Sequence, residues 1–319
     1  MCYTYSKGGG ILIINTGMRT DIPAFYPEWF IERIRTGFVL VRNPYRPEWI
    51  TRYELSPEVV DCIAFCTKNP EPMLKYMEEL RAFHQYWFVT ITPYGREAEP
   101  NVPPKETVMQ SFCRLSEAVG TDCVGWRYDP IFINGRYTLE RHIRDFEEMC
   151  RTLSGYTRVC VISFIDLYEK VKRNFPQVRT VTPAERTAIG KAFAEIAGRY
   201  GITVKACAEG KDLAPYGIDC GGCMTKETFE KAVGCRLTVP KKKSQRSECA
   251  CVLGTDIGAY DTCGHLCRYC YANSDRENVR RNMKAHDPCS PLLVGYPAEG
   301  EVIHQAKQES WTDSQLSFF

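Results

Sequence analysis

The chain has neither a strong net charge nor a long hydrophobic run. Its 41 lysines and arginines nearly balance its 39 aspartates and glutamates, so the net charge of +2 gives no overall signal for nucleic acid. No hydrophobic stretch approaches the roughly 20 residues that cross a membrane. The opening residues are polar and glycine-rich, and the run from Ile11 to Ile14 is too short for an export signal. These absences predict a cytoplasmic protein with no membrane partner.

Cysteine, by contrast, is abundant. The chain of 319 residues contains 17 cysteines, and ten of them fall between Cys207 and Cys289. In a reducing compartment, clustered cysteines indicate metal or redox chemistry rather than disulfide bonds. The remaining cysteines are scattered, several of them in hydrophobic runs where cysteine behaves as a small buried hydrophobe. We assign no chemistry to these scattered residues: Cys2, Cys62, Cys66, Cys113, Cys123, Cys150 and Cys160.

Short hydrophobic runs alternate with longer stretches of helical period, which is typical of repeated β-α units and a parallel sheet. The predicted strands are residues 11–15, 38–42, 62–66, 86–92, 123–127, 158–163 and 202–206. The predicted helices are residues 27–36, 70–83, 104–119, 138–153 and 182–199. Seven strand-like runs in about 200 residues favour an α/β fold built as a full or partial (β/α) barrel.

The pattern divides the chain into three regions. Residues 1–206 are predicted to form the barrel-like domain. From residue 207 the regular alternation stops, and residues 207–290 are predicted to form a loop-rich, cysteine-rich segment that binds a cluster over the barrel mouth. Residues 291–319 are predicted to form a polar, partly extended tail.

Polar residues follow each predicted strand. In a parallel barrel these positions share the C-terminal rim, where ligands bind. Loops are polar in any case, so a single such residue indicates little, but the repeated pairing of a charge with Asn or Asp favours a site. The rim residues are Arg19, Asp21, Arg42, Asn43, Lys68, Asn69, Thr90, Thr92, Arg127, Asp129, Ser163, Cys207 and Glu209.

The most informative stretch is Cys263-Gly-His-Leu-Cys267-Arg-Tyr-Cys270-Tyr271, with the spacing C-x3-C-x2-C. Three thiolates on one short loop hold three irons of a [4Fe-4S] cluster and leave the fourth iron open for a ligand. A zinc knuckle or half of a ferredoxin site is the alternative, but the paired C-x2-C steps of those sites are missing. We expect His265 to be solvated or hydrogen-bonded rather than a ligand.

This motif resembles the cluster motif of radical S-adenosylmethionine enzymes, including spore photoproduct lyases, although theirs usually lies near the N-terminus. The resemblance implies a catalytic [4Fe-4S] cluster whose open iron binds S-adenosylmethionine, and a reductant such as ferredoxin or flavodoxin. Candidate residues for holding S-adenosylmethionine are Tyr269, Tyr271, Arg127 and Asp129. The sequence assigns no catalytic residue beyond the cluster ligands.

Nearly the whole chain also resembles a bacterial and archaeal family catalogued as domain of unknown function 1848. The segments that carry this resemblance are residues 19–25, 42–44, 67–70 and 245–273. The family has cysteines that match Cys207, Cys223, Cys249 and Cys251, which implies a second, fully ligated [4Fe-4S] cluster. Structural zinc is the alternative, because four thiolates suit either metal. Cys220 is an alternative to Cys223, and the sequence does not decide whether Cys235 or Cys289 is a ligand.

The substrate is indicated only indirectly. The last five residues, Gln315 to Phe319, resemble the peptide by which bacterial DNA-repair proteins dock onto the sliding clamp; the alternative is that Phe318 and Phe319 pack on the barrel. Basic runs at residues 241–246 and 276–284 flank the cysteine-rich motif and are either phosphate contacts or solvated faces. A flipped base would need stacking partners, for which Trp87 and Trp126 are candidates unless they lie in the core.

The sequence therefore predicts a radical S-adenosylmethionine enzyme that generates a 5′-deoxyadenosyl radical and acts on a nucleic-acid-related substrate. One alternative is a radical enzyme acting on a peptide or small metabolite. The other is a non-enzymatic iron-sulfur or zinc binding module associated with DNA.

Overall fold

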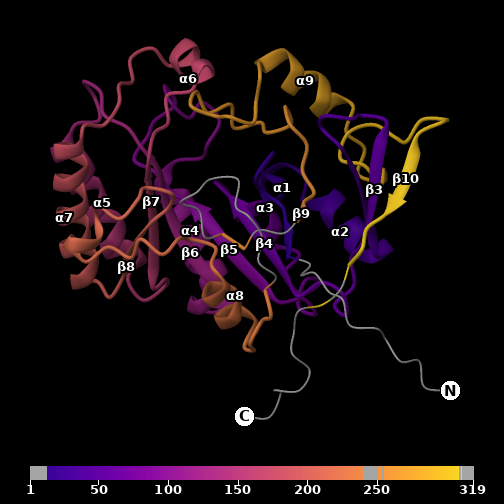
Figure 1. Cartoon of the computed structure of the whole chain (residues 1–319), viewed down its shortest axis with the longest axis horizontal. Coiled ribbons are helices and arrows are strands. Elements are labelled where there is room, and N and C mark those ends of the chain that lie inside the picture. Colours follow the sequence, from indigo (N-terminus) through magenta and orange to yellow (C-terminus); the bar gives the residue numbers. More distant parts are fainter. Residues whose placement is uncertain (1–12, 240–250, 253–254, 309, 311–319) are drawn as a thin grey trace.

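A parallel sheet of seven strands, in the order β8-β7-β6-β5-β4-β1-β9, forms the centre of the molecule (Figure 1). The structure is a computed structural model that describes residues 13–239, 251–252, 255–308 and 310. All the hydrogen-bonded neighbours in this sheet run parallel, so the predicted α/β fold is confirmed. The strands are β1 (Ile13–Asn15), β4 (Cys62–Thr67), β5 (Gln85–Thr90), β6 (Val124–Ile131), β7 (Val159–Phe164), β8 (Thr203–Ala206) and β9 (Thr255–Asp256).

The helices begin largely where the sequence predicts them. Thr182 and Glu185 form a reciprocal capping box that fixes the start of the longest helix, α7. The predicted helix 70–83 is wrong in length: α3 ends at Leu74, and turns with hydrogen bonds spanning three residues, such as Tyr76 N to Met73 O, replace the rest. The helices are α1 (Ile22–Phe25), α2 (Pro27–Thr36), α3 (Glu71–Leu74), α4 (Lys105–Val119), α5 (Leu139–Leu153), α6 (Glu169–Asn174), α7 (Pro183–Arg199), α8 (Lys226–Val233) and α9 (Arg276–Lys284).

Among the described residues, no helix is long and apolar enough to cross a membrane.

α8 was not predicted, and it lies inside the segment expected to be mostly loop. Its Thr225 cap accepts a hydrogen bond from the Thr228 backbone, and Phe229 and Val233 are its buried residues. The hydrophobic residues of so short a helix are too few to give a clear periodic signal.

The two faces of the sheet are covered by different parts of the chain, because successive side chains of a strand point in opposite directions. On one face Phe65 stacks on Trp87 with ring centroids 3.9 Å apart, beneath helices that include α2, α4, α5 and α7. On the other face Tyr86 and Phe88 pack with residues of the cysteine-rich segment, including Phe229 of α8. The cysteine-rich segment therefore fills the face that would line the inside of a closed barrel.

The structure shows no closed barrel. β8 pairs with β7 on one side, β9 pairs with β1 on the other, and within the described ranges no strand joins these two edges. β9 has only two residues, which gives little backbone for a further ladder. The sheet is thus an open, seven-stranded arrangement of β-α units, and only the partial form of the predicted barrel is compatible with it.

The predicted strand 38–42 forms, but not in the main sheet. β2 (Phe38–Arg42) pairs antiparallel with β3 (Trp49–Glu54), and β10 (Val302–Gln305) pairs parallel with β3. Leu40, Ile50 and Leu292 form the small hydrophobic cluster beneath this second sheet. The polar tail therefore contains a strand, which lies beside β3 at the right of Figure 1.

Candidate cysteine-lined functional site

The C-terminal ends of the parallel strands surround a cavity of about 310 Å³. Its walls include many of the residues that follow the predicted strands, because parallel strands bring their carboxyl ends to one edge. All three cysteines of the C-x3-C-x2-C motif also line it. The predicted rim residues that reach this cavity are Asp21, Lys68, Thr90, Arg127, Asp129, Ser163, Cys207 and Glu209.

Five predicted rim residues lie outside the cavity lining. Arg42 and Asn43 belong to the end of β2, and Arg42 forms an ion pair with Glu301 near β10. Their predicted placement on the rim was wrong because β2 belongs to the second sheet and not to the main sheet. Arg19 Nε instead contacts Asp256 Oδ1 at 2.8 Å and fastens β1 to β9. The other two make local hydrogen bonds: Asn69 Oδ1 accepts from Glu71 N at 3.3 Å at the start of α3, and the Thr92 hydroxyl donates to Glu99.

The cluster-motif loop is held by hydrogen bonds to the loop after β5. Asn101 Nδ2 donates to Gly264 O at 2.7 Å, Asn101 N donates to His265 O at 3.2 Å, and Arg268 N donates to Ala98 O at 2.9 Å. Gly264 is required sterically, because a Cβ atom there would lie 2.7 Å from the Phe25 ring. These contacts fix the backbone that carries the three thiols.

His265 anchors the same loop from inside and is not available as a simple solvent-facing ligand. The residue is buried, and its Nε2 lies 2.9 Å from Asp21 Oδ2. Asp21 also accepts the Lys68 backbone N–H at 2.7 Å, so one carboxylate joins β1, β4 and the motif loop. The expectation that His265 is hydrogen-bonded is confirmed.

Leu266 stands between His265 and Cys267 with a φ of 55°. This left-handed conformation costs a residue with a Cβ atom roughly 1 kcal/mol or more, so the surrounding contacts must impose it. It turns the chain sharply inside the motif. Cys263 and Cys267, which lie on either side of this turn with three residues between them, both line the cavity.

A buried cation lies beside the motif. Lys68 Nζ contacts Glu99 Oε1 at 2.8 Å, and the same oxygen accepts hydrogen bonds from Thr92 and from the Tyr269 hydroxyl. Burial raises the pKa of the Cys267 thiol, and the Lys68 ammonium opposes that rise by favouring the thiolate. The Glu99 carboxylate acts in the opposite direction and raises the pKa of the same thiol, so Lys68 is the member of the pair that favours a thiolate ligand.

Arg127 and Asp129 point into the cavity from β6 and form an ion pair there. Asp129 also accepts a hydrogen bond from the Ser163 hydroxyl on β7. Burial opposes the charge on Arg127, but nearby Asp129 and the cysteines outweigh it and raise the pKa of the guanidinium. Arg127 Nε is buried and has no hydrogen-bond partner among the described residues. It is thus a donor that a bound ligand would satisfy.

The two tyrosines that flank Cys270 both line the cavity, as the predicted site requires. They differ in environment. Tyr269 is half-buried and packs near Tyr94 and Phe132, with its hydroxyl donating to Glu99. Tyr271 is exposed by 57%, and its hydroxyl donates to Met18 O at 2.5 Å.

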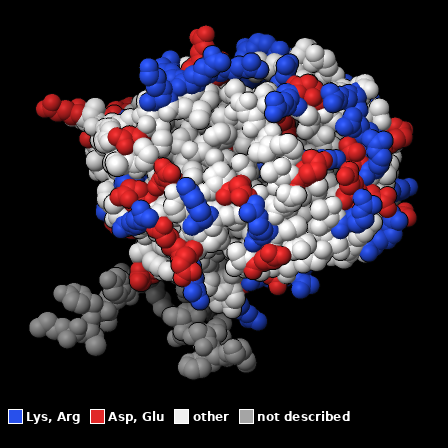
Figure 2. Space-filling model, turned by 180° about the vertical axis from the view of Figure 1, so that it is seen from behind, with Lys and Arg blue, Asp and Glu red and all other residues white. Residues whose placement is uncertain are grey.

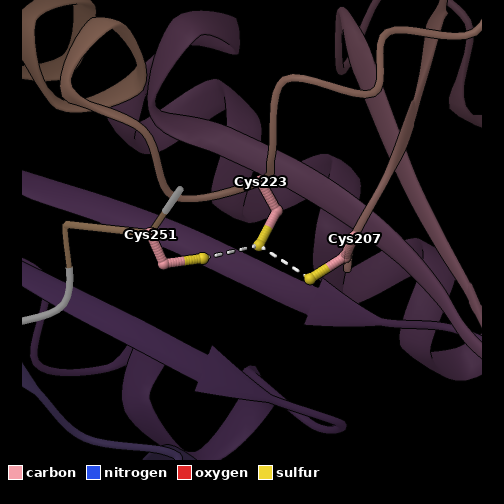
Figure 3. Close-up of side chains that lie close together, drawn as sticks. All are labelled: Cys207, Cys223 and Cys251. Atoms are coloured by element: carbon pink, nitrogen blue, oxygen red, sulfur yellow. Dashed lines mark hydrogen bonds between the residues drawn. The ribbon is translucent and has the colours of Figure 1, made fainter. Parts of the chain in front are cut away.

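A second group of cysteines lies on the inner face of the sheet. Figure 3 shows Cys223 between Cys207 and Cys251. The Cys223 sulfur lies 3.3 Å from the sulfur of each of the other two cysteines. All three sulfur atoms lie within 4.8 Å of one another. We call this set the tight group, and Cys263, Cys267 and Cys270 the motif group.

The tight group is assembled by backbone contacts and hydrophobic packing. Cys207 N donates to Ile162 O at 3.0 Å, which continues the pairing of β8 with β7. Val252 N donates to Met224 O at 2.8 Å, which brings Cys251 beside Cys223. Hydrogen bonds to Cys223 and Cys251, followed by burial, raise the pKa of the Cys207 thiol. A metal ion must displace such protons in order to bind.

The remaining candidate cysteines are separated from these two groups. Cys223, rather than Cys220, joins the tight group, and Cys220 Sγ contacts Ile218 O at 3.7 Å. Cys235 and Cys289 join neither the tight group nor the cavity lining. Cys249 lies outside the described residues, as do the basic run 241–246 and the predicted docking peptide at residues 315–319.

Two tryptophans considered for base stacking belong to the core. Trp87 and Trp126 are fully buried, and Trp126 stacks on Phe146 with ring centroids 5.0 Å apart. Neither lines the cavity, so the core position given as the alternative to base stacking is confirmed. Their alternation within hydrophobic strands already favoured a core position.

Sequence reasoning missed Glu99 and Asn101, which position the motif loop. Both follow β5 in a proline-rich loop, where no regular spacing marks a site. Asp166 and Tyr168 were also missed, and they line the cavity after β7. Their position just past a strand end was the signal available, but no residue beyond Ser163 was assigned to the rim after this strand.

The fold and the site define a class: an open α/β protein with two cysteine groups around the C-terminal ends of its parallel strands. The chain matches the domain of unknown function DUF1848 over residues 13–272 and belongs to that family. No curated protein matches the chain.

Among solved structures, the chain is similar to a crystal structure of a proposed alpha-L-fucosidase from Bacteroides thetaiotaomicron. The identity is 8% and the TM-score is 0.26, with 73% of this chain and 99% of that chain covered. This likeness is too low to support an argument about fold or function.

Proposed function

We propose that the protein is a radical S-adenosylmethionine enzyme whose catalytic [4Fe-4S] cluster binds to Cys263, Cys267 and Cys270. One observation carries the proposal: the three motif cysteines and the charged strand-end residues line a single cavity. Three cluster-binding thiols without a neighbouring cavity would also suit a protein that only stores an electron. Thiols beside a cavity lined by Arg127 and Asp129 provide room and polar partners for a bound cofactor.

The donor set of the motif group fits an open cluster. A cube places each thiolate on a separate iron and so keeps the sulfurs well apart. Among the described residues, only the tight group has all its sulfurs within 4.8 Å of one another, so the motif group is the wider set. Lys68 beside Cys267 would offset the negative charge of a thiolate-bound cluster.

When bound and reduced, such a cluster supplies the electron that cleaves S-adenosylmethionine into methionine and a 5′-deoxyadenosyl radical, which removes a hydrogen atom from the substrate. The chain's own residues would bind and orient the cofactor. Asp129 is suited to accept from its amine, and Arg127 is suited to donate to its carboxylate through the unpaired Nε. The Tyr269 ring, held by Glu99, closes one wall and excludes water.

For the tight group, the sulfur spacing favours the zinc alternative over the auxiliary [4Fe-4S] cluster. Four thiolates at about 2.3 Å from one tetrahedral ion lie about 3.8 Å from one another. The distances of 3.3 Å and the limit of 4.8 Å bracket that value. Cys249 remains the predicted fourth ligand. We therefore propose a single tetrahedral ion here, with the auxiliary cluster as the alternative that metal analysis tests.

For the substrate, the charge of the cavity favours a small molecule over a nucleic-acid strand. Its lining contains four carboxylates, namely Asp21, Asp129, Asp166 and Glu209, but only two cationic side chains, Lys68 and Arg127. An excess of carboxylates disfavours a phosphate backbone and suits the cationic S-adenosylmethionine. We retain a nucleic-acid-related substrate as the competing proposal, in which one nucleoside, rather than the strand, enters the cavity.

Anaerobic reconstitution tests the proposal. The purified chain is loaded with iron and sulfide, reduced with dithionite, mixed with S-adenosylmethionine and assayed for 5′-deoxyadenosine. We expect about four irons per chain and deoxyadenosine formation, both lost in Cys267→Ala and both kept in Cys289→Ala, whose cysteine is exposed. A wild-type protein that holds zinc at the motif group, or holds iron without cleaving the cofactor, would refute the enzyme and favour the binding module.

A further inference from the structure

A second hollow lies on the outer side of the cluster-motif loop. It has a volume of about 690 Å³, and two of its lining residues, Cys267 and Cys270, also line the cavity at the C-terminal ends of the strands. Residues of the loop therefore separate the hollow from the cavity. We call it the outer groove, and its charged lining residues are Arg173, Arg268, Asp275, Arg276, Glu277 and Arg281.

The outer groove is basic, because its four arginines exceed its two carboxylates, a balance of +2. Arg173 at the end of α6 and Arg276 at the start of α9 form no ion pair with any described residue, and Arg281 only donates to Asn278 Oδ1. Asp275 is already used as the cap of α9. Three of these arginines, Arg173, Arg276 and Arg281, are exposed.

The groove is part of a larger basic edge. Figure 2 shows lysine and arginine side chains gathered along the upper edge of the molecule, where Figure 1 places α6 and α9. Unpaired cations on an exposed edge attract an acidic partner and speed its encounter. The feature thus has the charge of a docking surface as well as contact with two cluster ligands.

We propose that the outer groove docks a small acidic electron-carrier protein that reduces the cluster from behind Cys267 and Cys270. The inference rests on the proposed function of the motif group. One electron passes from the reduced carrier to the cluster, so the carrier is oxidised by one electron and no covalent bond changes. A cofactor held by Arg127 and Asp129 would lie on the cavity side, which would leave the groove side of the loop free for the carrier.

A nucleic acid is the other partner that a basic groove suits, but the position favours the carrier. A substrate must reach the cavity, whereas the groove lies across the loop from it. A carrier gains from this position, because two ligand cysteines, Cys267 and Cys270, are among the residues that line its docking surface. The described part of the groove also offers no aromatic side chain on which a base could stack.

The test compares variants of one helix. In Arg276→Gln/Arg281→Gln, both α9 arginines of the groove lose their charge; in the control, Arg280→Gln, an exposed arginine of α9 outside the groove lining loses its charge. Reduction of the reconstituted cluster by photoreduced flavodoxin is followed by stopped flow. We expect the double variant to slow reduction about 10-fold at low ionic strength, with the difference fading in high salt. Arg280→Gln should change the rate much less.

Dithionite separates the two proposals. If the wild-type protein does not cleave S-adenosylmethionine even with dithionite, the proposed function fails. If dithionite works in every variant but flavodoxin reduces the double variant at the wild-type rate, only the groove proposal is overturned. Weaker binding of a single-stranded oligonucleotide by the double variant, with unchanged flavodoxin reduction, would also overturn it. Arg173→Gln on α6 repeats the test should the α9 variant fold poorly.

Discussion

The two cysteine groups are built in different ways, although Cys207 of the tight group also lines the cavity beside the motif group. The motif group sits on a loop at the strand ends, beside a cavity lined by charged residues. The tight group packs with hydrophobic residues on the sheet face, where Cys223 is buried beside Met224. The first arrangement leaves space for a ligand, and the second brings sulfurs close enough to surround one ion. Position on the fold thus distinguishes an open site from a closed one.

Their supports differ as well. Hydrogen bonds from Asn101 and the pair of His265 with Asp21 hold the motif loop. The tight group combines backbone hydrogen bonds with hydrophobic packing among Tyr86, Phe88 and Phe229. Hydrogen bonds fix direction with a modest net contribution, whereas buried apolar area contributes most of the stability. Hydrogen bonds therefore fix the orientation of the loop that carries the motif group, whereas the tight group is part of the hydrophobic core.

The largest effect is expected from removing one cysteine of each group. Cys267→Ala should lose about four irons and keep the zinc, whereas Cys223→Ala should lose about one zinc and keep the irons. Elemental analysis of the two variants after anaerobic reconstitution measures both metals. If Cys223→Ala instead loses about four of eight irons, the tight group holds the auxiliary cluster.

Metal binding at the tight group should weaken steeply as the pH falls. Hydrogen bonds to Cys223 and Cys251, followed by burial, raise the pKa of the Cys207 thiol, so the thiol is protonated in the absence of metal. Because binding releases protons, affinity is higher at high pH, and each proton released contributes about a tenfold change per pH unit. Chelator competition between pH 6 and pH 8, in the variant Cys267→Ala, measures the slope. A flat profile would contradict proton release.

Glu99→Gln should strongly destabilise the motif side. The change removes the carboxylate that pairs with the Lys68 ammonium. Both side chains are largely buried, because Lys68 is 14% exposed and Glu99 is 3% exposed. Breaking a buried ion pair from one side costs about 3 to 5 kcal/mol of unfolding free energy. Urea unfolding measures the loss, with Glu78→Gln as the control, since its ion pair with Arg81 is exposed. Equal stability of the two variants would show that Lys68 does not depend on Glu99.

Two substitutions with smaller effects compare the contacts that hold the tight group and the motif loop. Met224→Ala removes buried apolar contacts beside the tight group and should cost about 2 to 5 kcal/mol. Asn101→Ala removes the hydrogen bond to Gly264 O and should cost about 1 kcal/mol. Urea unfolding of the metal-loaded variants gives both values. A larger loss for Asn101→Ala would reverse the order of the two supports.

The sequence determined the elements of the fold more fully than their assembly. Hydrophobic alternation located the main strands, and Thr182 with Pro183 located the start of α7, because these signals are local. It did not show that residues 38–42 join another sheet, since pairing with β3 and β10 depends on residues far along the chain. The same limit applies to α3, whose early end at Leu74 no local pattern indicated.

For the site, the sequence by itself determined the chemistry of the groups: three thiols on one short loop, and charges just past the strand ends. Only the tertiary structure decided which of them meet. It placed Asp129 and Cys267 on one cavity, left Arg42 outside it, and brought Cys207, Cys223 and Cys251 together across 44 residues of chain. The physical reason is that side-chain chemistry is a property of each residue, whereas distance between remote residues is set by strand pairing and by packing of the whole chain.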